Sequence, residues 1–472
     1  MGLTARRARS AARVVLYGLL IWVPLPLGSN RPFAWAVNGL AAAIMLAFVV
    51  RGEMGTRKSV ALDRRGEVFL GLGFLILLVW MLIQASPFTP AFLHNEIWLR
   101  PAVAQTGAAA AISISPSATL IAIPQLCFLV AVAFAAARVG ADQGRTTTLL
   151  TVVFAASVLN AAYGLLELAR GHQFLSVVPD AYEGYLTGTF VNRNTAATFF
   201  ALGIGTGLSL LVTRAEARGT HHSSRMVLLL AELSGKGGLY LLGLLTLVSA
   251  LICTGSRAGF AAAALGIAAV IVVALRRRGV GWGRQALAVL LLCILCVVPL
   301  WYSVGERIDR LGGEDLTLRL GLYRGTWKAL LTAPFTGLGA GTFPRYFPLY
   351  RGDDLPVDLA WTHAHNSYLE SAASLGIPAM LLLLFLQIYV FALVCRRVGD
   401  NKRAYPAGVA AVVAGVIVGF HSLFDFSLQI AGVGVVFAAL LGCAFGEATS
   451  AAASGPLVRV ARTAQWSREA LP

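Results

Sequence analysis

Long apolar runs recur along almost the whole 472-residue chain, and they restrict its fold more than any other feature. A helix of about 20 mostly apolar residues is long enough to cross the hydrocarbon core of a bilayer. The runs are continuous and lack the alternation of barrel strands, which excludes a β-barrel. Charged residues make up 13% of the chain, against about 25% in soluble domains. The sequence therefore predicts an all-α polytopic membrane protein.

The apolar runs predict about twelve transmembrane helices. The chain then divides into nine helices within 1–303, a large loop at 304–367, three helices within 368–446 and a polar tail at 447–472. We expect no packed structure in the tail. The predicted spans are 14–28, 33–50, 67–85, 119–137, 147–168, 195–213, 237–253, 258–275, 285–303, 368–395, 405–422 and 429–446.

Positive charge orients these spans. The net charge of +16 would point to nucleic acid in a soluble protein, but the rule that cytoplasmic loops are basic explains it better. If the basic N-terminus lies inside, most of the 38 Lys and Arg residues fall in inner segments. No small-residue cleavage site follows the first apolar run, so we expect a retained helix. Both termini are then cytoplasmic, and the loop 304–367 faces outward.

The six cysteines all lie in or beside apolar runs. Cys293 and Cys296 form a CxxC pair, but its flanks are apolar and no second pair follows. Buried small side chains explain them better than zinc or redox chemistry. We expect neither a metal site nor a disulfide framework. The others are Cys127, Cys253, Cys395 and Cys443.

The outer loop contains a predicted amphipathic helix at about 316–333. Its apolar stripe comprises Leu316, Leu320, Tyr323, Trp327 and Leu330, which indicates a helix lying on the membrane surface. Arg319 and Arg324 flank the stripe on opposite sides, to contact either lipid phosphates or a lipid-linked phosphate substrate. The following GLGAG, residues 337–341, lacks the spacing and lysine of a P-loop, so it predicts a flexible turn.

Two histidines precede the next predicted span. His363 and His365 stand two apart, just before Asn366, and do not share a helix face. Without a third ligand nearby they favour a single general base over a metal site. Glu370 lies near the top of the span and is expected to orient the histidine.

A further histidine and a carboxylate occur in HSLFDF, at the last predicted outer turn. His421 and Asp425 there form either a pair that supports the general base or an ordinary polar cap.

Two more arginines lie at outer turns. Arg257, in TGSRAG, is either an interfacial anchor or an anion clamp, because a guanidinium offers forked donors to phosphate. In GTFVNRNTAA, Asn194 and Thr195 can cap the span at 195–213. Arg193 at that helix start could add to an anion site. An outward-facing enzyme has no ATP, so its substrate must arrive activated, and a sugar on a lipid diphosphate fits.

The sequence resembles the O-antigen ligase and O-antigen polymerase superfamily of bacterial inner-membrane proteins. The matching pieces are GTFVNRNTAATFFAL, TGSRAGFAAAALG, RLGLYRGTWKALLTAPFTGLGAGTF, HAHNSYLESAASLGIPAMLLL and FHSLFDFSLQ. Their order and spacing across residues 186–430 carry the resemblance.

The resemblance implies an inverting, metal-independent glycosyltransferase of GT-C type that needs no cofactor. It would take a glycan from undecaprenyl diphosphate at the periplasmic face and pass it to an acceptor such as lipid A-core. Matched by position, His365 is the base, with His363 the less frequent match. Arg257 and Arg319 bind the diphosphate, with Arg324 as the alternative to Arg319.

Several other functions remain open. A polymerase of O-antigen or exopolysaccharide is the nearest, since its acceptor is another lipid-linked glycan. A protein O-oligosaccharyltransferase is disfavoured because the chain lacks a large soluble C-terminal domain. A small-anion transporter is disfavoured because the spans contain few charges and no broken-helix pair. An inactive scaffold is the remaining alternative.

Overall fold

The computed structural model describes residues 2–54, 62–101, 107, 109–171, 182–217, 236–287, 317–356, 360–400 and 405–453. Every regular element within these ranges is helical. Eight of the described helices are long and apolar enough to cross a membrane, and two shorter apolar helices accompany them. The predicted all-α, multi-span membrane protein is therefore confirmed, whereas the number twelve stays a prediction.

Helices occupy the predicted spans that the described residues cover. Most of the predicted span 285–303, with Cys293 and Cys296, lies outside those residues. The bounds are α1 Gly2–Trp22, α2 Pro32–Met54, α3 Arg64–Ala85, α5 Pro116–Gly140, α6 Gln143–Arg170, α7 Arg193–Ala217, α9 Lys236–Cys253, α10 Arg257–Arg277, α12 Phe343–Tyr350, α13 Ser367–Leu375, α14 Ile377–Asp400, α15 Pro406–His421 and α16 Ala431–Ala453.

Two predicted span boundaries are wrong. The first helix begins at Gly2 and ends at Trp22, because the basic segment is helical and Pro24 and Pro26 then stop the helix. The predicted span 368–395 is two helices, α13 and α14, separated at Gly376 with φ +85°. The apolar pattern continues through this break because α13 is buried as well, so periodicity does not reveal it.

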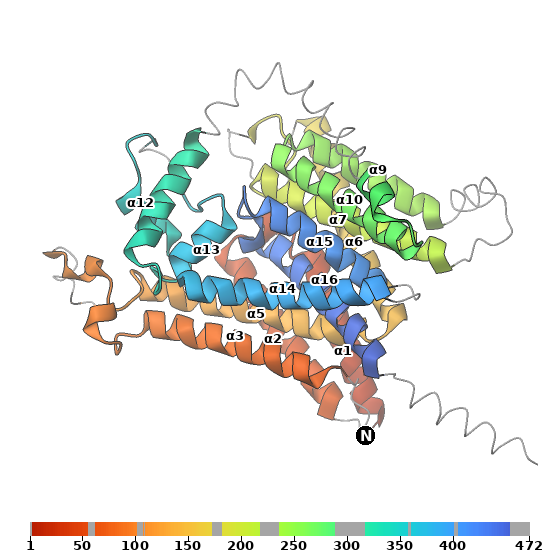
Figure 1. Ribbon diagram of the computed structural model, residues 1–472, viewed down its shortest axis with the longest axis horizontal. Helices are drawn as coiled ribbons and strands as arrows, with labels where there is room; N and C mark the ends of the chain where they lie inside the picture. Colours follow the sequence, from red (N-terminus) through yellow and green to blue (C-terminus); the bar gives the residue numbers. More distant parts are fainter. Residues whose placement is uncertain are drawn as a thin grey trace, which may run out of the picture.

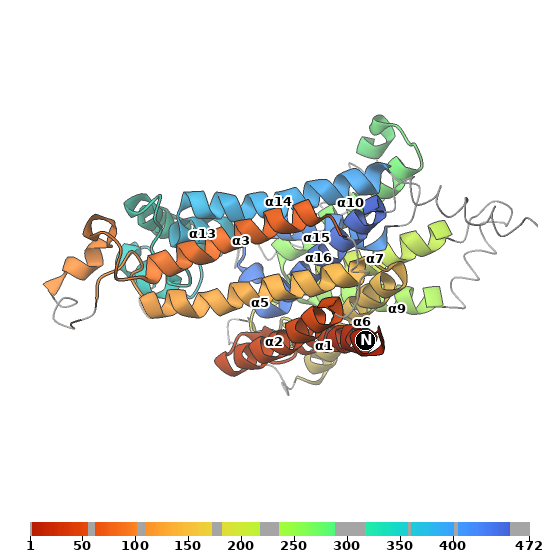
Figure 2. The ribbon, with the colours of Figure 1, turned by 90° about the horizontal axis from the view of Figure 1, so that it is seen from below.

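The innermost spans are α7 and α16, which are mostly buried, while most of the others expose a broad face. Glycines let α16 approach α5 closely: a Cβ at Gly442 or Gly446 would collide with the carbonyl of Ala133 or Ala137. Small residues at a crossing are how membrane helices gain packing. Figure 2 shows α1 and α2 on one side of α5, with α14 on the other.

A second, smaller core lies at one end of the bundle, where the helix over 317–332 and α12 run across the direction of the spans (Figure 1). Leu322, Leu330, Phe343 and Phe347 are among its buried members. The helix over 317–332 confirms the predicted element. Along its predicted apolar stripe, Leu330 is buried in this core, whereas Leu320 is 46% exposed and Trp327 is 54% exposed. The predicted placement of this stripe on the membrane surface stays a prediction.

The glycine-rich turn at 337–341 is confirmed as a turn, but it is anchored rather than free. Backbone N–H groups of Leu338 and Gly339 donate to Ala373 O and Ser374 O, each at 2.9 Å. Gln84 of α3 donates to Ser374 O at 3.0 Å. These bonds fix the small core to the top of α3 and to the end of α13.

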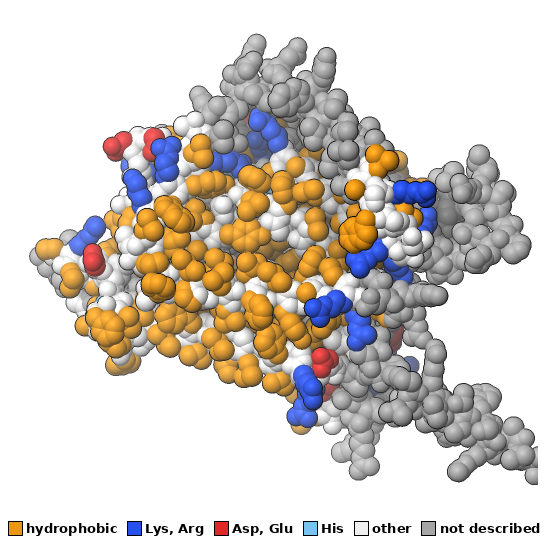
Figure 3. Space-filling model, in the orientation of Figure 1, with side chains coloured by type: hydrophobic (Ala, Val, Ile, Leu, Met, Phe, Trp, Pro, Cys, Tyr) orange, Lys and Arg blue, Asp and Glu red, His pale blue; other side chains and the backbone are white. Residues whose placement is uncertain are grey.

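Charge separates the two ends of the bundle. In Figure 3 a wide hydrophobic face covers the spans, with Lys and Arg predominating along one end, where a few acidic side chains accompany them, and with both signs at the other. The basic end is where α3 and α6 begin and where α5 and α14 end. Arg64, Arg138, Arg145 and Arg397 stand there. The pattern agrees with the predicted cytoplasmic side, which stays a prediction.

Candidate active site

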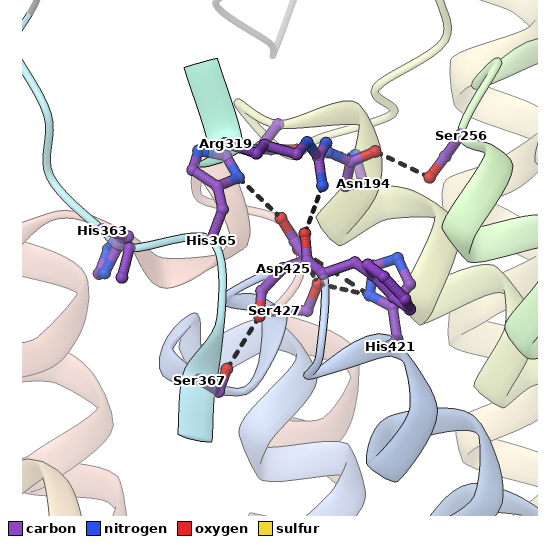
Figure 4. A network of polar contacts seen from close by, with 12 residues as sticks. Asn194, Ser256, Arg319, His363, His365, Ser367, His421, Asp425 and Ser427 are labelled. Carbon is purple, nitrogen blue, oxygen red and sulfur yellow. Dashed lines mark hydrogen bonds and ion pairs between the residues drawn. The ribbon is translucent and has the colours of Figure 1, made fainter. Parts of the chain in front are cut away.

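The candidate site forms where helix ends meet, at the end of the bundle opposite the basic one (Figure 4). Helices α7, α10 and α13 begin there and α15 ends there. The start of the helix over 317–332 and the turn between α15 and α16 complete it. Segments far apart in the sequence therefore place polar side chains in one region.

The centre of this region is a histidine and a carboxylate. His365 Nδ1 lies 3.5 Å from Asp425 Oδ1, an ion-pair contact rather than a short hydrogen bond, and the Asp425 side chain is almost fully buried. The other carboxylate oxygen accepts from Ser427 Oγ. Burial opposes ionisation of Asp425, but His365, His421 and Ser427 outweigh it and lower the pKa of that carboxyl to about 2. Asp425 is thus charged at neutral pH.

The backbone of His365 is unusual. Its φ is +53°, a conformation that a residue with a Cβ rarely adopts and that costs roughly 1–3 kcal/mol. Tyr323 donates to His365 O at 3.0 Å and contacts Leu423 O at 3.1 Å. The imidazole also meets Phe426 edge-on, with centroids 4.8 Å apart. These contacts hold the ring against Asp425.

The second histidine has a different partner. His363 Nδ1 lies 3.1 Å from Glu370 Oε1, and its ring stacks on Phe426 at 4.2 Å. Glu370 also accepts from the N–H of Ala364 at 2.7 Å. Glu370 was expected to orient His365, the predicted base. It contacts His363 instead, and the carboxylate beside His365 is Asp425. Asn366 caps α13 by accepting from Leu369 N at 3.0 Å.

The two candidate arginines of the helix over 317–332 separate. Arg319 donates to the carbonyl of Phe424, the residue before Asp425, and Figure 4 shows it beside the His365–Asp425 pair. Arg324 instead pairs with Asp354 at 3.2 Å, with side chains 65% and 37% exposed. The geometry brings Arg319 to the histidine and leaves Arg324 on a neighbouring surface.

The starts of α7 and α10 are tied together. Ser256 caps α10 and donates to Asn194 Oδ1 at 2.7 Å. The predicted cap of α7 is wrong: Asn192 Oδ1 accepts from Asn194 N at 2.7 Å, which frees the Asn194 side chain to hold Ser256. The exposed Arg257 side chain directly follows Ser256.

Arg193 and Arg257 differ in their surroundings. Arg193 lies over Tyr185, with 4.3 Å from guanidinium carbon to ring centroid, and donates to Gly255 O at 3.5 Å. In the described part of the chain, the Arg257 side chain is exposed and makes no hydrogen bond or ion pair. Arg257 is therefore available to an incoming anion, whereas Arg193 braces the turn beside it.

A buried hydroxyl network lies behind Asp425, and sequence reasoning missed its hydroxyl members. Thr198 Oγ1 is 2.8 Å from His421 Nδ1 and 2.9 Å from Ser427 Oγ. His421 Nδ1 lies 4.0 Å from Asp425 Oδ2. The available signal was Thr198, a polar residue inside an apolar span, one helical turn after Asn194. His421 and Asp425 thus belong to one buried polar network next to His365.

The arrangement can do two things. A histidine beside a charged carboxylate can take a proton from a hydroxyl, and exposed guanidinium groups can bind a phosphate-bearing group. Within the described residues, no group of three or more His, Cys, Asp or Glu side chains could hold a metal ion.

Residues 242–384 match the family model Wzy_C, described as O-Antigen ligase. Comparison with curated proteins gave no match. The resemblance read from the sequence is confirmed over this segment, which contains Arg257, Arg319 and His365. Asn194, His421 and Asp425 lie outside it. Members of this family transfer glycans from lipid carriers as ligases or polymerases.

Proposed function

We propose that the chain is an O-antigen ligase-like glycosyltransferase. It moves a glycan from undecaprenyl diphosphate to an acceptor hydroxyl, such as that of a lipid A-core sugar, at the periplasmic face of the bacterial inner membrane. The observation that carries the proposal is the His365–Asp425 pair beside Arg319, with His365 and Arg319 inside the matched segment.

His365 acts as the general base. With Nδ1 against the Asp425 carboxylate, the imidazole keeps its proton on Nδ1, and Nε2 offers its lone pair to the acceptor hydroxyl. As Nε2 takes the hydroxyl proton, Asp425 stabilises the imidazolium that forms. The low pKa of Asp425 supports this role, because the carboxylate stays charged while His365 changes its protonation.

The arginines act on the leaving group. The acceptor oxygen bonds to the anomeric carbon from the face opposite the diphosphate, the carbon–oxygen bond to the diphosphate breaks, and the sugar inverts. Negative charge grows on the diphosphate as that bond lengthens, so donors placed there lower the barrier. The exposed Arg257, and Arg319 beside the His365–Asp425 pair, fit this role. Arg324, paired with Asp354, is the weaker candidate.

The remaining parts of the proposal concern placement. We assign the basic end of the bundle to the cytoplasm, together with both termini, and the histidine end to the periplasm. We also assign a GT-C architecture, in which a multi-span bundle carries the site at its outer end. The gathering of the candidate residues where helix ends meet, away from the middle of the spans, supports an enzyme over an anion transporter.

Reconstitution tests this function. Purified protein in proteoliposomes would receive an undecaprenyl diphosphate-linked glycan, with or without lipid A-core, in the absence of metal and nucleotide. Transfer that requires lipid A-core identifies a ligase, and chain growth without it identifies a polymerase. No turnover in either case by folded protein would contradict the proposal, and the folded His365→Ala protein is the inactive control.

A further inference from the structure

A second cluster of arginines lies at the basic end, far from the histidines. Four arginines from three helices line one pocket between α1, α2, α5 and α6. Glu53 of α2 is the acidic residue in its lining. The four are Arg9 and Arg13 of α1, Arg138 of α5 and Arg145 of α6.

Internal ion pairs neutralise only part of this charge. Arg138 contacts Glu53 at 3.4 Å and also pairs with Glu67. Arg145 pairs with its neighbour Asp142 at 3.2 Å. Within the described residues, Arg9 and Arg13 make no ion pair with a carboxylate, and Arg13 donates to Ser10 Oγ at 2.8 Å. The pocket therefore keeps an excess of positive charge.

The two unpaired arginines are partly buried. Arg9 and Arg13 are one helical turn apart on the same face of α1, and both line the pocket. Two like charges placed in this way are stabilised by an anion bound beside them. By contrast Arg6 and Arg7, on the same helix, are exposed. The rule that cytoplasmic segments are basic is enough to explain the exposed Arg6 and Arg7. It does not explain why Arg9 and Arg13 line a pocket together with arginines of two other helices.

The lining of the pocket changes from charged to apolar side chains along the direction of the helices. One helical turn further into the spans it is lined by Leu16, Val49 and Ala135. Val14 and Val50, which follow the lining residues Arg13 and Val49 in the sequence, are exposed. This order of charge and then apolar surface matches the headgroup and the first acyl carbons of a lipid. A free phosphate ion would leave the apolar surface uncovered.

We propose that this pocket binds the phosphate of an anionic glycerophospholipid, with Arg9 and Arg13 as its main contacts. The lipid joins α1 and α2 to α5 and α6 through its headgroup. This site is independent of glycan transfer, and its occupancy is measured without the transferase substrates.

Native mass spectrometry and thermal unfolding of the full chain in detergent test the site. The probes are phosphatidylglycerol, phosphatidylcholine and inorganic phosphate. We expect phosphatidylglycerol to bind and to raise the unfolding temperature, phosphatidylcholine to do neither, and inorganic phosphate to have little effect. An equal shift with inorganic phosphate would overturn the lipid assignment, and an equal shift with phosphatidylcholine would overturn the pocket.

The chain offers a matched pair of variants. Arg9→Gln with Arg13→Gln should weaken phosphatidylglycerol binding by about tenfold or more, since each arginine near an anionic headgroup contributes about one factor of five. Arg6→Gln with Arg7→Gln removes the same charge from the exposed side of α1 and should leave binding near wild type. Equal losses in the two variants would show a general charge effect and contradict a specific pocket. The wild-type comparison of lipids stands even where a variant folds poorly.

Discussion

The carboxylate of Asp425 lies 3.5 Å from Nδ1 of His365, although the two residues belong to different turns of the chain. Asp425 is buried, and Ser367 donates to its backbone carbonyl at 3.0 Å. The same turn thus supplies a charge to one side of the imidazole and a hydrogen-bond acceptor to the start of α13. This double attachment sets the orientation of the proposed base.

Replacing Asp425 by Asn should reduce transfer by about 100-fold, the lower end of what acid–base catalysis contributes. The amide would no longer stabilise a protonated His365. The measurement is the initial rate of glycan transfer in proteoliposomes at saturating acceptor. Glu370→Gln is the control, because Glu370 contacts His363 instead. A larger loss in Glu370→Gln would reverse the assignment of the two histidines.

Stability should depend on acidity through Asp425. Its pKa is about 2 in the folded protein, below the ordinary value of 3.8. A lowered pKa stabilises the fold above about pH 4, and this contribution of about 2 kcal/mol is lost as pH falls toward 2. Thermal unfolding in detergent between pH 6 and pH 2 measures the decline. Asp425→Asn should show a smaller decline, and an identical one would mean that other carboxylates cause it.

Arg319 and Arg324 should differ in their effect on transfer. Arg319→Gln removes a donor beside the histidine pair and should lower turnover about 100- to 1000-fold, as expected for a group that stabilises transition-state charge. Arg324→Gln removes an exposed ion pair with Asp354 and should change turnover only a few-fold. The measurement is the transfer rate of each variant with equal amounts of folded protein. A larger loss in Arg324→Gln than in Arg319→Gln would make Arg324 the diphosphate ligand.

Thr198→Val should lower transfer without abolishing it. The hydroxyl holds His421 and Ser427 behind Asp425, and its loss leaves buried polar groups without a partner. We expect about tenfold lower turnover, with recovery in Thr198→Ser, which keeps the hydroxyl. A wild-type rate in the valine variant would show that the network serves the fold alone.

The sequence predicted the spans well because burial in a bilayer demands a long apolar run, which is a local property. The partner of His365 is not local. Glu370 was preferred because it stands five residues on, whereas Asp425 reaches His365 only once α15 has folded back. The sequence did indicate His421 and Asp425 together, since both stand in HSLFDF at the last predicted outer turn.

The choice between Arg319 and Arg324 depended on tertiary packing in the same way. The two side chains leave the helix on different faces, and the sequence does not show which face packs on α12. Leu320 and Trp327 of the apolar stripe are exposed, while Gly321, Gly325 and Ala329 allow close packing on the neighbouring face. Small residues carry little hydropathy signal but permit the closest contacts.

The glycine turn between the helix over 317–332 and α12 provides a test of how the small core is anchored. Gly337 has φ +68°, and a Cβ there would meet Ser374 O and Gly376 N at 2.4 Å. Backbone atoms cannot move aside as a flexible side chain can, so Gly337→Ala should destabilise the protein by about 2 kcal/mol or more.

Gly341 is the matched control. Its φ is similar, +70°, but a Cβ there meets Ala118 O at 3.4 Å, an ordinary contact. Gly341→Ala therefore incurs the backbone strain alone and should lower the unfolding temperature less than Gly337→Ala. The loss in Gly337→Ala should also reduce transfer, since the same turn fixes α13 and, through it, the segment that carries His365. Equal losses of stability in the two variants would mean that backbone strain explains the whole effect and that the contact of Gly337 with α13 adds nothing to it.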